Sequence, residues 1–221
     1  MSRKTKIIGS GLLLTVTIFV LLFFLLLPRI ITVYTTFEIL PVSPQIKSFA
    51  WIKLLEDKAD DGKSEQSADG KLFSYFYEKE QDMLWFRLET YNPINPNTPA
   101  VSVAIDTDAD QNTGTNWYGS NRKFTFEKML SVGPVSKDGE KFIGYNGITN
   151  EQGVRERKWI NEKENVIALY LDADSNAYIM GIKRSEISPN LKKINVIGSV
   201  GADVLWNDDI SNEGFATINL E

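Results

Sequence analysis

The chain opens with one long apolar run and then changes to short alternations of hydrophobic and polar residues. Residues 7–27 hold no charged side chain over 21 positions. A helix of about 20 residues spans a hydrocarbon core of about 30 Å. The pattern therefore predicts one N-terminal transmembrane helix followed by a mostly β domain.

The flanks of the apolar run predict its orientation. Arg3, Lys4 and Lys6 lie in the segment 1–6, and basic residues tend to stay on the cytoplasmic side of a membrane. We therefore expect the following domain outside the cytoplasm, at the cell surface or in the periplasm. A cleavable signal peptide is the alternative, but its apolar stretch is usually only about 7 to 15 residues and ends at small residues. Here the run is longer and bulky residues follow it, which favours an uncleaved signal anchor.

The rest of the chain indicates a linker and an all-β domain. Pro41 and Pro44 disfavour a helix in the segment 28–47, which is predicted to be a juxtamembrane linker. In residues 48–221, β-branched and aromatic runs alternate with turn residues, which is typical of an antiparallel β-sandwich or barrel. The predicted strands are residues 72–77, 83–91, 101–106, 123–130, 141–145, 166–172, 177–182, 194–200 and 215–220.

Two of these strands form the clearest predicted hairpin. Residues 72–77 and 83–91 flank a polar turn, so we expect them to pair antiparallel. The face of the second strand that is predicted to point into the core carries Leu84, Phe86, Leu88 and Thr90. Residues 185–193 predict one short helical turn, with Ser185 as its N-cap.

The residue types that the chain lacks exclude several kinds of chemistry. There is no Cys and no His, which excludes thiol catalysis, His-based triads, ordinary zinc sites and His-ligated haem. A cysteine-free domain also fits an exported bacterial protein that folds without disulfides. When the four basic residues beside the apolar run are set aside, 20 basic residues face 29 acidic ones, a net charge of −9. This acidity disfavours nucleic acid as a partner.

Alternating oxygen-bearing residues form the most informative motif. Asp106, Asp108, Asp110 and Asn112 follow one another at every second position as the chain leaves an apolar strand. Calcium takes six to eight oxygen ligands, and neighbouring carboxylates repel each other unless a cation neutralises them. We therefore expect these four residues to bind a structural Ca²⁺. A solvated turn without metal is the alternative.

The calcium motif is not a regular EF-hand, because Gln111 and Trp117 stand where that loop needs Gly and Glu.

The other acidic segments of the chain have simpler explanations. Residues 172–176 fit a tight turn between two predicted strands. Residues 57–69 hold four Asp residues that fit a solvated loop, and one of them reaching the same cation is the open alternative.

Aromatic residues in predicted loops are candidates for ligand binding. Trp117 and Tyr118 follow the calcium motif, and Trp206 precedes Asp208. Flat rings stack on sugar faces while nearby polar groups orient the hydroxyls. These four residues are therefore candidates for a carbohydrate site. A sandwich also needs Trp in its core, and for each ring core packing is the favoured interpretation.

Three stretches of the chain carry a resemblance to a known family: LWFRLETYN at 84–92, VSVAIDTDADQNTGTNWYGSN at 101–121 and VIGSVGADVLWNDDISNEG at 196–214. They resemble carbohydrate-binding module family 9 and the related DOMON-like domains. The resemblance covers about residues 48–221 and implies one jelly-roll-like sandwich with structural calcium. It also implies, in many members, a sugar-binding or cofactor-binding surface. The haem-binding branch is disfavoured, because no His is present.

Three functions follow from these observations. The first is a membrane-anchored, extracytoplasmic, calcium-stabilised module that recognises a carbohydrate or cell-envelope glycan. The second is a non-catalytic protein-interaction or scaffold domain of an envelope complex. The third is an enzyme, for which only carboxylate-based chemistry such as glycoside hydrolysis remains open.

Overall fold

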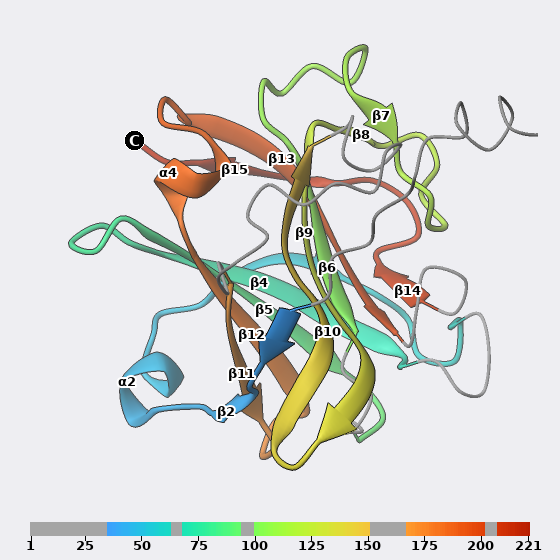
Figure 1. Ribbon diagram of the computed structural model, residues 1–221. Helices are drawn as coiled ribbons and strands as arrows, with labels where there is room; N and C mark the ends of the chain where they lie inside the picture. The colour runs from blue at the N-terminus through green and yellow to red at the C-terminus, as the bar shows by residue number, and fades with distance from the viewer. Residues whose placement is uncertain (1–34, 63–67, 94–99, 151–166, 202–206) are drawn as a thin grey trace, which may run out of the picture. The chain divides into compact units, whose positions relative to one another are not determined.

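The computed structural model describes residues 35–62, 68–93, 100–150, 167–201 and 207–221 (Figure 1). Within these ranges, no helix has the length and apolar character needed to cross a bilayer. The predicted cytoplasmic segment, 1–6, and the predicted anchor, 7–27, lie outside the described residues.

Two sheets make up most of the described chain. The first has the order β1-β10-β9-β6-β13-β14, with β15 also paired to β13. Its strands are β1 (Thr35–Phe37), β6 (Val101–Asp106), β9 (Lys128–Asp138), β10 (Lys141–Asn150), β13 (Lys193–Gly201), β14 (Asn207–Ile210) and β15 (Ala216–Asn219). Each of its described pairings is antiparallel.

The second sheet has the order β2-β11-β12-β5-β4-β3. Its strands are β2 (Leu40–Pro41), β3 (Ile52–Glu56), β4 (Gly70–Glu78), β5 (Met83–Thr90), β11 (Ala168–Asp172) and β12 (Ala177–Lys183). These pairings are antiparallel except for the short β2–β11 pair, which is parallel. A separate ribbon joins β7 (Thr115–Asn116) to β8 (Thr125–Phe126).

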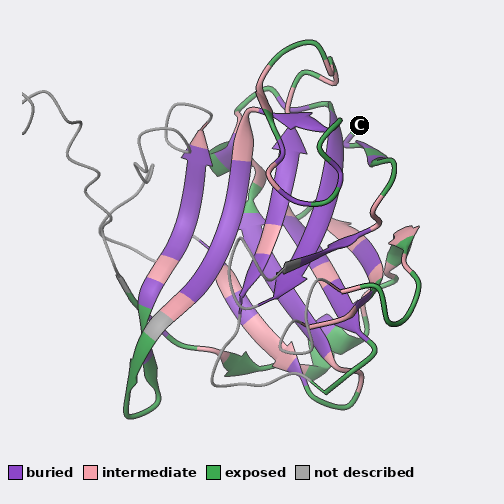
Figure 2. Cartoon of the chain, turned by 90° about the vertical axis from the view of Figure 1, so that its right-hand side faces the viewer, coloured by how far each residue is buried: buried purple, intermediate pink, exposed green. Residues whose placement is uncertain are grey.

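The two sheets share one hydrophobic core, which makes the described fold a β-sandwich. Side chains alternate between the two faces of a strand, so every second residue of β5 points inward. Leu84, Phe86 and Leu88 are all fully buried there and pack in one cluster with Val103 and Ile105 of β6. Figure 2 shows buried residues along the strands and exposed residues along the loops and turns. The predicted hairpin and its inward face are thus confirmed.

The sheets begin earlier in the chain than the sequence indicates. The predicted linker, 28–47, enters the described part at Thr35 and already contains β1, β2 and α2 (Pro44–Lys47). Pro44 does not prevent this helical turn, because Pro is compatible with the first position of a helix. Ser43 caps the turn by accepting a hydrogen bond from Ile46 N at 3.3 Å. β1 and β2 therefore pair with strands of the sandwich although they precede the predicted boundary at residue 48.

The second short helix also differs from its prediction. α4 spans Arg184–Ile187, and its N-cap is Lys183, which makes no side-chain capping bond. Ser185 lies inside the helix rather than at its cap. The predicted strand 123–130 is divided between β8 and the start of β9.

A second, smaller core lies on the outer face of the first sheet. The connection from β6 to β9 folds back over that face with its own bulky residues, Trp117, Phe124 and Phe126. They pack on Ala104 of β6 and on Met129 and Ile197 of the neighbouring strands. This packing fixes the loop that carries the predicted calcium motif.

Candidate functional site

Three carboxylates meet where β6 ends. Asp106 is the last residue of β6, Asp108 follows in the loop, and Glu127 lies between β8 and β9. One ligand oxygen from each of the three lies within 4.8 Å of the other two. Glu127 is absent from the sequence-predicted set. It reaches the site because its backbone N–H donates to Ile105 O at 3.2 Å, beside the end of β6.

Asp106 is the buried member of this group. Its side chain is fully buried, and Oδ2 accepts hydrogen bonds from the side-chain amides of Gln111 and Asn195. Its other oxygen, Oδ1, is buried and has no hydrogen-bond partner. Buried polar atoms nearly always have a partner in folded proteins, and an unmatched carboxylate oxygen is especially costly. A cation at this point would satisfy Oδ1.

Asp108 and Glu127 complete a negatively charged group. Thr107 N donates to Glu127 Oε2 at 2.8 Å, and the Thr113 hydroxyl donates to Glu127 Oε1 at 3.1 Å. Burial raises the pKa of Glu127, and the negative charges of Asp108 and Asp106 add to the rise. No basic residue in the described ranges forms an ion pair with these three carboxylates. Repulsion between them is therefore unbalanced unless a cation binds.

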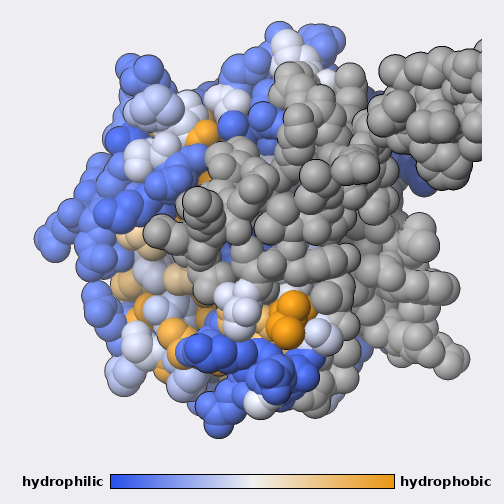
Figure 3. Space-filling view, in the orientation of Figure 1, coloured by the Kyte–Doolittle hydropathy of each residue, from blue (hydrophilic) through white to orange (hydrophobic). Residues whose placement is uncertain are grey.

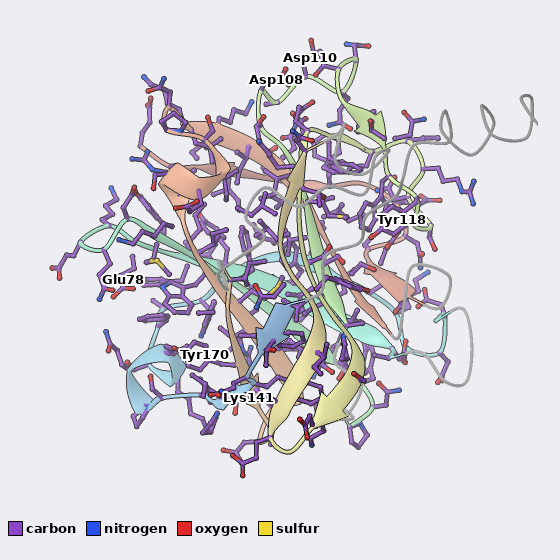
Figure 4. The ribbon with its side chains drawn as sticks, viewed as in Figure 1. Glu78, Asp108, Asp110, Tyr118, Lys141 and Tyr170 are labelled. Atoms are coloured by element: carbon purple, nitrogen blue, oxygen red, sulfur yellow. The ribbon has the colours of Figure 1, made fainter. Side chains whose placement is uncertain are left out.

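The other two predicted ligands, Asp110 and Asn112, form hydrogen bonds with each other. Asp110 Oδ1 accepts hydrogen bonds from Asn112 N at 3.0 Å and from Asn112 Nδ2 at 2.7 Å. These bonds lower the pKa of Asp110 and form a local turn. Asp110 does not belong to the carboxylate group, and the amide nitrogen of Asn112 is engaged with Asp110. Figure 4 shows Asp108 and Asp110 in the loop beyond β6, near β7. The structure thus groups the carboxylates of Asp106 and Asp108 with that of Glu127, whereas the carboxylate of Asp110 lies outside this group.

The two described rings of the predicted platform, Trp117 and Tyr118, pack against each other. Trp117 is only 1% exposed, and its Nε1 donates to Asp209 Oδ2 at 3.0 Å. Tyr118 packs on Trp117 with a ring-centroid distance of 4.1 Å, and its hydroxyl donates to the sulfur of Met129 at 3.3 Å. Burial raises the pKa of Tyr118. The Trp117 ring therefore packs in the smaller core, as the core-packing interpretation of this residue expects.

Of the remaining two predicted ligand residues, Asp208 lies in the described part. Trp206 lies outside the described residues. Asp208 is 1% exposed and accepts a hydrogen bond from Gly70 N at 2.7 Å. It lies beside Asp57 and Asp61, two carboxylates of the loop that is predicted to be solvated. These two meet Asp208 and not the group at Asp106.

A cleft of about 580 Å³ opens between the two sheets along β1 and β10 on one side and β11 and β12 on the other. Its charged lining residues are Glu38, Lys141 and Lys183, of which Lys141 and Glu38 form an ion pair at 3.1 Å. The only described aromatic residue in its lining, Phe37, is 1% exposed and belongs to the main core. The cleft therefore does not provide the ring platform that a sugar site uses.

Comparison of the chain with protein-family models, with curated proteins and with solved structures gives no match.

Proposed function

We propose that this chain is a calcium-stabilised, non-catalytic binding module, held outside the cytoplasm by its predicted N-terminal helix, with a carbohydrate or cell-envelope glycan as its ligand. The observation that carries the calcium part is the buried, unpartnered Oδ1 of Asp106 beside Asp108 and Glu127. Calcium suits this group, because it binds oxygen ligands in flexible geometry. The absence of His and Cys from the chain disfavours the other common metals of such sites.

The proposed family is that of carbohydrate-binding module family 9 and the DOMON-like domains. The two described sheets support a jelly-roll-like sandwich, because strands close in sequence, such as β5 and β6, belong to opposite sheets. The VSVAIDTDADQNTG stretch, which carries the resemblance, forms β6 and the loop that holds Asp106 and Asp108. This placement supports the resemblance at its most specific motif.

Burial of Trp117 moves the proposed glycan surface to other rings. The outer face of the second sheet carries an aromatic group, in which Trp85 and Ile179 are covered by Ile46 of α2. Around them Trp51, Phe76 and Tyr170 are only partly buried. Figure 4 shows Tyr170 next to α2. Half-exposed rings on a rigid sheet are the apolar platform on which sugar faces stack.

Polar groups lie among these rings. Trp85 Nε1 donates to Glu78 Oε2 at 2.9 Å, and Arg87 forms an ion pair with Glu89 on the same face of β5. A sugar site combines a ring platform with a few polar groups that orient the hydroxyls. The outer face of the second sheet, defined by Trp51, Phe76, Trp85, Arg87 and Tyr170, supplies both.

A glycan array probed with the full-length protein in mild detergent tests the ligand. We expect binding that falls at least tenfold for Trp51→Ala and for Tyr170→Ala. Phe215→Ala is the matched control, since Phe215 is 41% exposed and lies next to β15 of the other sheet. Binding that all three variants retain, or no binding by the wild type, would contradict the glycan proposal.

The alternative is a protein-interaction or scaffold domain of an envelope complex. Burial of Trp117 favours it, because this ring is not available for stacking on a sugar. Figure 3 shows hydrophobic residues gathered in small groups among hydrophilic ones on the described part of one face. Crosslinking in intact cells followed by mass spectrometry separates the two functions. A single envelope protein crosslinked to the outer face of the second sheet would support the scaffold.

A further inference from the structure

A second group of carboxylates lies at the edge of the first sheet, where β14 is the last strand in the sheet order. Asp208 belongs to β14, and Asp57 and Asp61 follow β3 of the other sheet. One ligand oxygen from each lies within 4.8 Å of the other two. None of these residues belongs to the group at Asp106, and the sequence separates Asp208 from the other two by most of the domain.

Asp208 is buried deeply at this place. Its side chain is 1% exposed and accepts a hydrogen bond from Gly70 N at 2.7 Å. A Cβ at position 70 would lie only 2.6 Å from Cγ1 of Ile210, so a glycine is required for this close approach. In the described ranges no basic residue forms an ion pair with Asp57, Asp61 or Asp208. A buried carboxylate without a counter-charge is strongly unfavourable.

Two neighbouring oxygens also lack partners. Asp57 Oδ2 and Asp69 Oδ1 are buried and accept no hydrogen bond. The other oxygen of each is satisfied, by Lys58 N at 3.0 Å for Asp57 and by Asp60 N at 2.9 Å for Asp69. Both of these unmatched oxygens belong to residues whose negative charges act on Asp208. Native proteins rarely leave such atoms without a donor or a cation.

We propose that Asp57, Asp61 and Asp208 bind a second divalent cation, and that this cation is calcium. The donor set is made of carboxylates alone, and Asp69 adds another carboxylate beside it. Mg²⁺ demands near-ideal octahedral geometry and keeps most of its waters, whereas Ca²⁺ accepts several protein oxygens in irregular geometry. The cation would join the loop after β3 to β14, and so connect the two sheets at one edge. This site is independent of the proposed function.

Isothermal titration of calcium into chelator-treated, full-length protein in mild detergent counts the sites. The experiment is run at pH 8, because burial and the neighbouring negative charges raise the pKa of Asp208 to about 7, and burial raises that of Asp57 to about 6. At that pH the carboxylates are ionised and protons do not replace the cation. We expect two calcium ions for the wild type and one for Asp108→Asn, which disables only the first site.

The second site is then tested in the Asp108→Asn background. We expect Asp61→Asn to weaken the remaining calcium binding at least tenfold, while Asp60→Asn leaves it within about twofold. Asp60 is the matched control, since it removes the same charge one residue away and lies outside the carboxylate group. Both positions are exposed, so both variants should fold, and circular dichroism checks this.

Each outcome decides the question. Equal binding by the Asp60 and Asp61 variants, or no calcium bound by the Asp108→Asn background at millimolar calcium, would overturn the second site. In another outcome the wild type binds one calcium, Asp108→Asn still binds it and Asp61→Asn does not. That result would confirm the second site and overturn the first. Absence of the second site and absence of the site at Asp106 therefore give different numbers of calcium ions bound by Asp108→Asn.

Discussion

Replacement of Glu127 by Gln should change the response of the protein to calcium in a way that a solvated turn would not. Glu127 is one of three carboxylates around the unpartnered Oδ1 of Asp106. Without calcium, Glu127→Gln removes one of three mutually repelling charges, so its melting temperature should equal or exceed that of the wild type. With calcium, the variant lacks one anionic ligand, so its melting temperature should fall below that of the wild type.

The size of the effect follows from binding linkage. Extracellular calcium modules have a Kd of about 10⁻⁴ to 10⁻³ M. With a Kd of about 10⁻⁴ M, calcium at about 10 mM stabilises the folded protein by about 2.7 kcal/mol. In a domain of this size that raises Tm by about 5 to 11 °C. A tenfold weaker Kd for Glu127→Gln reduces the gain to about 1.4 kcal/mol, or about 3 to 6 °C.

Thermal unfolding of the full-length protein in mild detergent, with calcium and with chelator, measures these shifts. Asp110→Asn is the matched control, because it removes a nearby charge and keeps the oxygen that accepts from Asn112 N. We expect this control to retain the full calcium shift. Loss of the shift in Asp110→Asn together with its retention in Glu127→Gln would refute the ligand set seen in the structure. No calcium shift in the wild type would refute the calcium site itself.

Three further variants test the packing of the loop between β6 and β9 and the charge of Asp172 at the turn between β11 and β12. Trp117→Phe removes the Nε1 donor to Asp209 and should lower the free energy of unfolding in urea by about 2 to 4 kcal/mol. Trp51 is only half-buried, so Trp51→Phe should lower it by less than about 1 kcal/mol. Equal losses in the two variants would argue against a stabilising role for the buried Trp117. Gly119→Ala should lower Tm strongly, because its Cβ would clash with Trp117 and with both carboxylate oxygens of Asp209. Gly139→Ala is the control, because Gly139 has open space around it. Its φ of +61° should cost an alanine only about 1 kcal/mol of backbone strain. Burial alone would raise the pKa of Asp172, but hydrogen bonds from Ser175 and Lys47 outweigh it and lower the pKa below its usual 3.8. The stability that this adds is present above about pH 4 and is lost as the pH falls through the lowered pKa. Ser175→Ala should therefore raise the pKa of Asp172 in an NMR titration, and an unchanged pKa would contradict this explanation.

Local alternation made the strands of the core predictable. In β5 every second residue is apolar, and Leu84, Phe86 and Leu88 are buried as that pattern predicts. The signal is local, because a strand with one buried face repeats every two residues. The N-terminal strands were missed, since two or three residues of β1 or β2 are too few to show an alternation.

The candidate site could be predicted only where its residues are close in sequence. Asp106 and Asp108 stand out as part of one motif, but Glu127 joins them only because β9 pairs with β6 and the chain returns beside Ile105. Pairing of distant strands leaves no mark in a single local pattern. The burial of Trp117 did have a signal: Phe124 and Phe126 are further bulky rings in the same polar loop, which is typical of a loop with its own core.

The carboxylate group at Asp208 could not be predicted from the sequence for the same reason. Asp57 and Asp61 look like a solvated loop in the sequence, because residues 57–63 are mostly charged. Their environment comes from β14, which brings Asp208 next to Gly70 at the start of β4. Charge clusters that span two sheets therefore become visible only in the folded chain.

Anomalous diffraction from crystals of the full-length protein grown with millimolar calcium tests the central claim most directly. The account predicts an anomalous peak about 2.3 to 2.6 Å from Asp106 Oδ1 and from oxygens of Asp108 and Glu127, the distance range of calcium–oxygen bonds. An ordered loop without a peak, or with a peak held by Asp110 and Asn112 alone, would contradict it.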